Sequence, residues 1–199
     1  MARPVKAESE RTRGDLLVAA ARAFGEKGFE GARLAEIAAG AGIRRPSLLY
    51  HFPTKEALYE AVVSDGFGEL GARLAAALAR PRSAPAAAAA AVRELKAFLL
   101  ARPEMARLLV RELLAGDGPG SRILLEEVVP LLDAVAAGLA RGGRRREGPR
   151  PREAVLAVAS SVLLRRASGE LGERLWGRGD GSGRLASALF GGRDAEVTG

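Results

Sequence analysis

The chain has 199 residues, of which 48% are hydrophobic, and a net charge of +7. It contains no cysteine and one histidine, which excludes disulfides, thiolate metal sites and sites made of three histidines, and its apolar share argues against a disordered chain. Alanine and leucine dominate that share, so the composition predicts an all-α protein, and the positive charge favours nucleic acid as a partner.

The first helix is predicted from about Ser9 to Lys27. Its apolar residues recur at the spacing of one helix face, namely Leu16, Ala20, Ala23 and Phe24. Gly28 follows, at the place where a glycine in the left-handed conformation commonly ends a helix.

Two short helices are predicted next, at residues 34–40 and 45–52. Gly42 lies between them, where a tight turn requires a positive φ. Leu48 and Phe52 are one turn apart on the second of these helices, so we expect them to pack inward together.

A longer helix is predicted from Lys55 to about Arg80, with Thr54 as its N-cap. Prolines and glycines separate the remaining predicted helices, which cover residues 85–101, 103–114, 121–141, 151–169 and about 183–190. The arginine run at 144–146 and the glycine-rich segment at 177–183 are interpreted as loops, and the RGD at 178–180 as a chance match.

The sequence shows no sign of a membrane segment. The first residues, MARPVKAESERTRG, lack the apolar core of a signal peptide. The most apolar run, Ala84–Val92, is short and is broken by Pro85, whereas a membrane span needs about 20 apolar residues. We therefore expect a cytoplasmic protein.

The segment from Leu34 to Leu48 has the residue spacing of a helix-turn-helix. With Leu34 as position one, Ala38 is at position five, where two crossing helices need a small residue, and Gly42 is at position nine, where the chain turns. The buried spacer positions are held by Ile37, Ala41, Ile43 and Leu48. Alanine and glycine are common in this chain, so chance matches are the alternative.

Polar side chains gather around the helix at 45–52, which would be the recognition helix. Such a helix contacts base edges mainly through its N-terminal residues, and arginine can bond guanine through two hydrogen bonds. The candidate DNA-binding residues are Arg33, Arg44, Arg45, Ser47, Tyr50, His51 and Lys55. Taken singly, Tyr50 is explained equally well by partial burial, and His51 by local capping or packing. Lys55 taken alone is explained equally well as a solvated side chain.

Residues 10–70 resemble the DNA-binding domain of the TetR family of bacterial transcription regulators. The matching segment is AARAFGEKGFEGARLAEIAAGAGIRRPSLLYHFPTKEAL at residues 20–58. The resemblance implies a homodimer that binds a palindromic operator, usually as a repressor. It also implies a C-terminal helical domain that binds a small effector and thereby releases the DNA. The expected domains are 10–70, with the helix-turn-helix at 33–52, and 81–191 for effector binding and dimerisation.

The sequence departs from the family pattern at four positions. Arg33 stands where the family usually has a Thr or Ser that caps the second helix. Arg44 and Pro46 stand where serine and glycine are common. Leu49 occupies the place of the family's tyrosine, and Tyr50 is rotated from that place by about 100° of helix.

The resemblance places the dimer interface on the helices near 151–169 and 183–190. An apolar stripe suits helix packing there, formed by Ala154, Val155, Val158, Val162 and Leu163. The same stripe is equally consistent with the subunit's own core. For the effector pocket, the candidate lining residues are Phe67, Phe98, Met105 and Leu109, although such residues are often ordinary core. Since polar groups are scarce around them, we expect an apolar effector.

The sequence gives no support for an enzyme, and we assign no catalytic residue, metal ligand or cofactor. It contains neither GxSxG nor GxxxxGK[ST]. We therefore expect a ligand-responsive DNA-binding regulator. The alternatives are a basic protein that coats DNA without sequence preference, and a small-molecule carrier or enzyme with a vestigial DNA-binding head.

Overall fold

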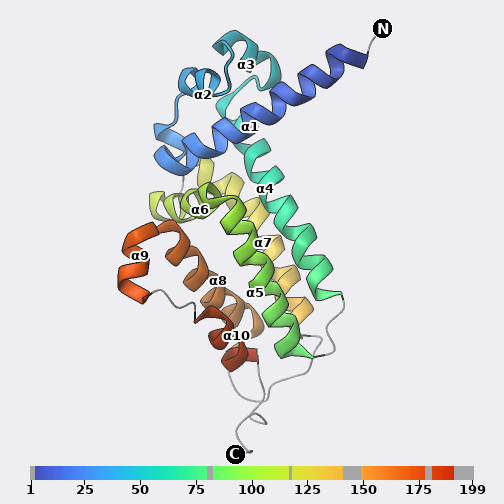
Figure 1. The fold of residues 1–199 in the computed structure, drawn as a ribbon, viewed down its shortest axis with the longest axis vertical. Helices are drawn as coiled ribbons and strands as arrows, with labels where there is room; N and C mark the ends of the chain where they lie inside the picture. Colours follow the sequence, from blue (N-terminus) through green and yellow to red (C-terminus); the bar gives the residue numbers. More distant parts are fainter. Residues whose placement is uncertain (1–2, 80–82, 117, 141–148, 178–180, 191–199) are drawn as a thin grey trace, which may run out of the picture.

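The computed structural model describes residues 3–79, 83–116, 118–140, 149–177 and 181–190. Within these ranges every regular element is an α-helix, as the composition predicts (Figure 1). The helices are α1 (Arg3–Gly31), α2 (Leu34–Gly40), α3 (Arg45–His51), α4 (Lys55–Leu78), α5 (Ala84–Ala101), α6 (Pro103–Ala115), α7 (Pro119–Ala140), α8 (Pro151–Ala167), α9 (Gly169–Trp176) and α10 (Ser182–Phe190).

The helices are arranged in two groups along the long axis of the molecule (Figure 1). Helices α1–α3 lie at one end, and we call them the head. Helices α5–α10 lie at the other end, and we call them the body. Helix α4 starts in the head and runs down into the body, where it packs against α5 and α7. The two groups are therefore joined by one continuous helix.

Helix α1 is longer than the sequence predicted. It begins at Arg3 rather than Ser9, because residues 3–8 place a proline in the first turn and contain no helix breaker after it. Gly28 has a positive φ, as expected, but its φ of 73° and ψ of 176° are not those of a left-handed cap. This conformation is essentially restricted to glycine. It kinks the helix, and one further turn continues to Gly31.

Helices α2 and α3 form as predicted, and Gly42 turns the chain between them with a φ of 71°. The Ile43 N–H donates to the Ala38 carbonyl at 3.0 Å and closes the turn. Ala38 is buried where the helices meet, and Leu48 is fully buried. The spacing of small and apolar residues thus produces the expected helix-turn-helix geometry.

The core of the head is built around three aromatic rings. The ring of Tyr59 from α4 meets those of Phe24 and Phe29 edge-on, with centroids 4.9 and 5.1 Å away. Thr54 caps α4 as predicted, because its hydroxyl accepts the Ala57 N–H at 3.0 Å. This core fixes the start of α4 on α1.

Helix α9 was not predicted. Glycines at 169, 172 and 177 give its segment the appearance of a loop. In the structure, Gly169 turns the chain after α8 with a φ of 53°. Arg165 then holds the far end of α9, because its Nη1 donates to the Gly177 carbonyl at 2.8 Å and its guanidinium lies over the Trp176 ring.

Several sequence features lie outside the described residues. These are the arginine run at 144–146, the RGD at 178–180, and Arg80 and Arg141, at which two helices were predicted to end. Within the described ranges, no helix is both long enough and apolar enough to cross a membrane.

Candidate DNA-binding surface and apolar cavity

Helix α3 divides its side chains between the core of the head and the solvent. Leu48 is fully buried and Phe52, its C-cap, is nearly so. The exposed side carries residues that were predicted to contact DNA, namely Arg44, Arg45, Ser47 and Tyr50, while His51 is half-buried. The predicted polar residues of α3 are thus brought together on one accessible side of a helix whose apolar side is anchored.

Tyr50 and Leu49 lie in different environments. Tyr50 is 84% exposed, and its ring meets that of His51 edge-on at 5.5 Å. Leu49 is partly buried and packs against the core of the head. The Tyr50 side chain therefore lies on the solvent side of α3, and the neighbouring Leu49 contributes an apolar side chain to the interior.

Arg33 precedes α2 without capping it. Its backbone is extended, and its side chain makes no capping hydrogen bond. A hydrogen bond from Lys27 lowers the pKa of Glu36, and the charge of the exposed Arg33 acts in the same direction. The Arg33 side chain is therefore exposed, and α2 lacks the side-chain cap that a threonine or serine would provide.

Lys55 makes contacts that the sequence did not indicate. Its ammonium donates to the Glu30 carbonyl at 3.0 Å and lies 4.8 Å from the centroid of the Phe29 ring. The start of α4 is thereby tied to the last turn of α1. An ammonium has three N–H donors, so this hydrogen bond leaves others for a second acceptor.

Residues 16–62 match the family model described as bacterial regulatory proteins, tetR family. Over 133 residues the chain is 37% identical to the HTH-type transcriptional regulator RutR of Escherichia coli K12, covering 65% of this chain and 62% of RutR. The chain belongs to the TetR family. It is also 31% identical over 148 residues to the HTH-type transcriptional repressor NicS of Pseudomonas putida, covering 68% of this chain and 66% of NicS.

This TetR-family chain spans just under two thirds of the length of RutR and NicS. Among solved structures, the transcriptional regulator FadR of Bacillus subtilis in complex with stearoyl-CoA is similar, with a TM-score of 0.70 and 17% identity. That match covers 90% of this chain and 98% of FadR. At this identity the likeness shows a shared fold that includes both head and body.

The body encloses a cavity of about 100 Å³. All four residues predicted for an effector pocket line it: Phe67 from α4, Phe98 from α5, and Met105 and Leu109 from α6. Helices α7, α8 and α10 complete the wall, and every described side chain that lines the cavity is apolar. Among the described residues, neither a charged group nor a hydrogen-bonding side chain faces the space.

Met105 also packs closely against α4. A Cβ atom built on Gly66 would lie 2.5 Å from the Met105 Cε, so α4 and α6 approach as closely as they do because residue 66 has no side chain. The wall of the cavity is therefore in direct contact with the helix that leads to the head.

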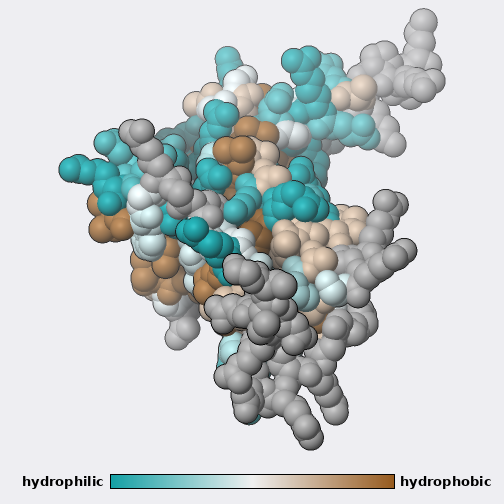
Figure 2. All heavy atoms as spheres, turned by 60° about the horizontal axis from the view of Figure 1, so that its bottom comes forward, coloured by the Kyte–Doolittle hydropathy of each residue, from teal (hydrophilic) through white to brown (hydrophobic). Residues whose placement is uncertain are grey.

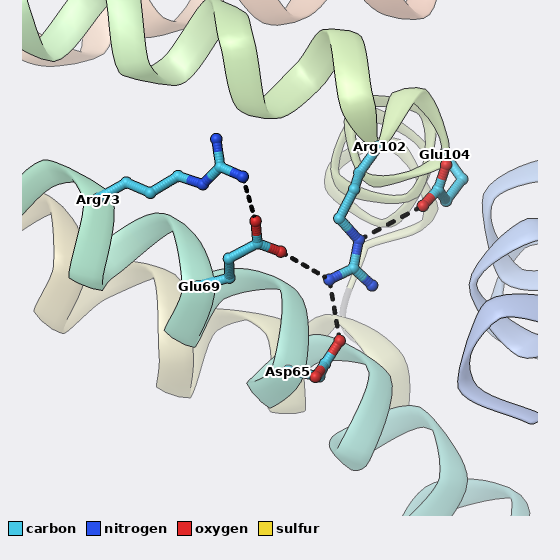
Figure 3. Close-up of polar contacts among 5 residues, drawn as sticks. All are labelled: Asp65, Glu69, Arg73, Arg102 and Glu104. Carbon is cyan, nitrogen blue, oxygen red and sulfur yellow. Dashed lines mark hydrogen bonds and ion pairs between the residues drawn. The ribbon is translucent and has the colours of Figure 1, made fainter. Parts of the chain in front are cut away.

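Beside this contact lies an ion-pair cluster that the sequence did not reveal (Figure 3). Arg102, between α5 and α6, donates to Asp65 at 2.9 Å and to Glu69 at 3.3 Å, and its Nε lies 3.6 Å from Glu104. Burial alone would lower the pKa of Arg102, but these carboxylates raise it above its usual value. The cluster joins α4 to the beginning of α6.

The apolar stripe of α8 faces the subunit's own core, the second of the two interpretations that the sequence left open. Ala154, Val155, Val158 and Val162 are buried, and Leu163 packs against them. Apolar side chains are instead exposed on the outer sides of α8 and α9, namely Leu156, Leu164, Leu171, Leu175 and Trp176. Figure 2 shows apolar surface on the side of the molecule where α9 lies. Periodicity located the apolar face of α8 but not its partner.

Proposed function

We propose that this protein is a ligand-responsive transcriptional repressor that binds a palindromic operator as a homodimer. The observation that carries the proposal is the presentation of Arg44, Arg45, Ser47 and Tyr50 on the exposed side of a helix anchored by Leu48. The names of RutR, a transcriptional regulator, and NicS, a transcriptional repressor, support it. We propose that the protein acts in the cytoplasm, where its operator would be. We propose no catalytic activity for it.

In this proposal α3 enters the major groove. Arg44 and Arg45, at its N-terminal end, reach guanine edges. Ser47, Tyr50, His51, Arg33 and Lys55 contact phosphates and set the position of the head on the duplex. The two heads of a dimer then occupy successive major grooves, about 34–36 Å apart.

We place the dimer interface on the outer sides of α8 and α9. An exposed group of leucines with a tryptophan is the composition of a protein interface core. Helix α10 packs against α5 and α8 of its own chain, so it supports this surface. The proposed domains are residues 10–70 for DNA binding and 81–191 for effector binding and dimerisation.

The proposed effector is a small, neutral, apolar molecule held in the cavity of the body. A charged group placed there would lose its hydration without gaining a partner, because none of the described lining residues has a polar side chain. FadR, of the same fold, binds stearoyl-CoA, which carries a long apolar chain, and this supports an apolar occupant. An apolar cavity of comparable size stays dry and takes up benzene.

We expect benzene to raise the melting temperature of the protein. Benzoate, which has the same ring and a charge, should leave it unchanged. Ligand binding to the folded state alone adds about 2.7 kcal/mol at 100 times Kd. Val158→Phe, which fills the cavity from α8, should remove the response to benzene. An equal response to benzoate would contradict a neutral effector while leaving the DNA-binding proposal in place.

We expect selection from random DNA to yield a palindrome with two half-sites. Arg45→Ala should then weaken binding to that site by about 5- to 150-fold, the loss of one arginine–guanine contact worth about 1–3 kcal/mol. Arg93→Ala, which removes the same charge from an exposed site on α5, is the matched control and should bind as the wild type does. Both are measured by fluorescence anisotropy at one fixed salt concentration.

Other outcomes of this selection favour the alternatives. Tight binding without a palindrome would favour a protein that coats DNA. Absence of DNA binding together with a response to benzene would favour a small-molecule carrier with a vestigial head. Selection of a palindrome that Arg45→Ala still binds at full strength would disprove the assignment of Arg45.

A further inference from the structure

A buried carboxylate lies where the head meets the body. Glu112 of α6 is only 3% exposed. Its Oε1 accepts the backbone N–H of Phe29, from the last turn of α1, at 2.7 Å. The hydroxyl of Ser121, from α7, donates to the Glu112 carbonyl at 3.0 Å and lies 3.5 Å from its Oε2. Through its side chain and its backbone carbonyl, Glu112 thus joins α1, α6 and α7.

The kink at Gly28 is what makes the Phe29 N–H available. In an unbroken helix this N–H would bond to the carbonyl of Gly25, four residues earlier. The φ of 73° and ψ of 176° at Gly28 interrupt that pattern. A buried N–H without a partner is costly, and the carboxylate of Glu112 supplies the partner.

Two glycines lie next to this carboxylate, and one of them, Gly120, makes room for it. A Cβ built on Gly120 would lie 2.7 Å from the Glu112 Oε2 and 2.6 Å from the Phe29 Cβ. A Cβ on Gly28 would lie 2.9 Å from the Arg111 Cδ and 3.6 Å from the Glu112 Oε1. The backbone of α7 can therefore approach Glu112 only because Gly120 lacks a side chain, whereas Gly28 is required by its backbone conformation.

The aromatic core of the head lies close to Glu112. Tyr59 packs against Phe29, and its hydroxyl is buried without a hydrogen-bond partner among the described residues. Burial raises the pKa of Tyr59, and the nearby charge of Glu112 raises it further. In such a setting a hydrogen bond to a carboxylate is strong, and its loss leaves unpaired buried groups on both sides.

Glu112 also shares a helix face with the cavity wall. Met105, Leu109 and Glu112 are spaced by four and then three residues, so they lie along one side of α6. The first two line the cavity and the third holds the head. About 10 Å of rigid helix separates Met105 from Glu112, at about 1.5 Å per residue. Figure 1 shows α6 directly below the end of α1.

We propose that Glu112 is a positioning residue that fixes the orientation of the head on the body by holding the Phe29 N–H. A displacement of α6 at Met105 or Leu109 is then carried to Glu112 and from there to the last turn of α1, which leads directly into α2 and α3. This inference goes beyond operator and effector binding, and the orientation of the head can be measured without either.

The absence of cysteine allows the head and body to be labelled at chosen sites. Ala39→Cys on α2 and Ala137→Cys on α7, both exposed, would carry a pair of spin labels, diluted with unlabelled protein so that only pairs within one chain are measured. We expect one narrow peak in the distance distribution of the double-cysteine variant. The same peak is expected when Glu112→Gln is added, because the glutamine amide oxygen still accepts the Phe29 N–H. Glu112→Leu, which keeps the volume but has no acceptor, should broaden or shift the peak.

Ser121→Ala is the matched control, because it removes the other contact of Glu112 and leaves the Phe29 bond. It should keep the narrow peak even if it lowers the melting temperature. For Glu112→Leu we also expect about tenfold weaker binding to the selected operator, if the competent orientation falls to about a tenth of the population. Glu112→Gln should restore it.

A folded Glu112→Leu with the wild-type distance distribution would overturn the proposal. If that variant fails to fold, hydrogen exchange in the unmodified protein decides. The Phe29 amide must then exchange as slowly as the amides of the head core, and fast exchange would equally overturn it. Failure to bind any operator would count against the proposed function, without affecting either of these two measurements.

Discussion

Leu48→Ala should lower the free energy of unfolding by about 2–5 kcal/mol. Leu48 is fully buried between α3 and the rest of the head, so truncation leaves a cavity that its neighbours can fill only in part. Urea denaturation followed by circular dichroism measures the loss. Because the loss concerns the anchoring of α3, DNA binding should fall together with stability.

Tyr50→Ala is the matched comparison two residues further on. Tyr50 is 84% exposed, so the change in stability should stay within about 0.5 kcal/mol. Operator binding should nevertheless weaken, since the phenol lies on the proposed DNA-binding side. Equal destabilisation by the two substitutions would contradict this description of α3, in which Leu48 anchors the helix and Tyr50 contacts DNA.

Gly28→Ala should destabilise the protein by about 1–3 kcal/mol, because it forces a side chain into a backbone conformation that is essentially restricted to glycine. The new Cβ would also press on the Arg111 side chain at 2.9 Å. The substitution disturbs the turn that delivers the Phe29 N–H to Glu112. Chemical denaturation gives the stability, and hydrogen exchange at Phe29 reports on the turn.

Gly68→Ala provides the control with the opposite sign. Gly68 is exposed within α4, and no atom lies within 4 Å of a Cβ built there. Alanine is favoured over glycine in a helix interior by about 0.5–1 kcal/mol, so this variant should be more stable than the wild type. Similar destabilisation by both substitutions would argue against a special conformation at Gly28.

The parts of the fold that could be predicted depend on neighbours in the sequence. The turn at Gly42, the cap at Thr54 and the inward positions of Leu48 and Phe52 each follow from residues less than two turns away. Such signals are local, and the structure confirms all of them. The resemblance of residues 20–58 to the TetR family rests on the same local pattern.

The features that could not be predicted depend on partners far along the chain. Arg102 and Asp65 are 37 residues apart, and Phe29 and Glu112 are 83 apart. A glutamate on the apolar face of α6, in register with Met105 and Leu109, was the available signal for a buried carboxylate. The sequence does not identify its hydrogen-bond partner, because the backbone N–H of Phe29 becomes free only through the kink at Gly28.

The apolar lining of the cavity determines how selective the proposed response would be. Because no described lining residue offers a hydrogen-bonding group, the cavity distinguishes neutral molecules by size and shape alone. One methylene more or less is worth only about 1–3 kcal/mol in such a site, and an isostere that adds a hydroxyl is not strongly rejected. A regulator with this cavity would respond to a range of compounds of similar shape. The width of that range would be set by the packing of a few side chains such as Phe67 and Met105.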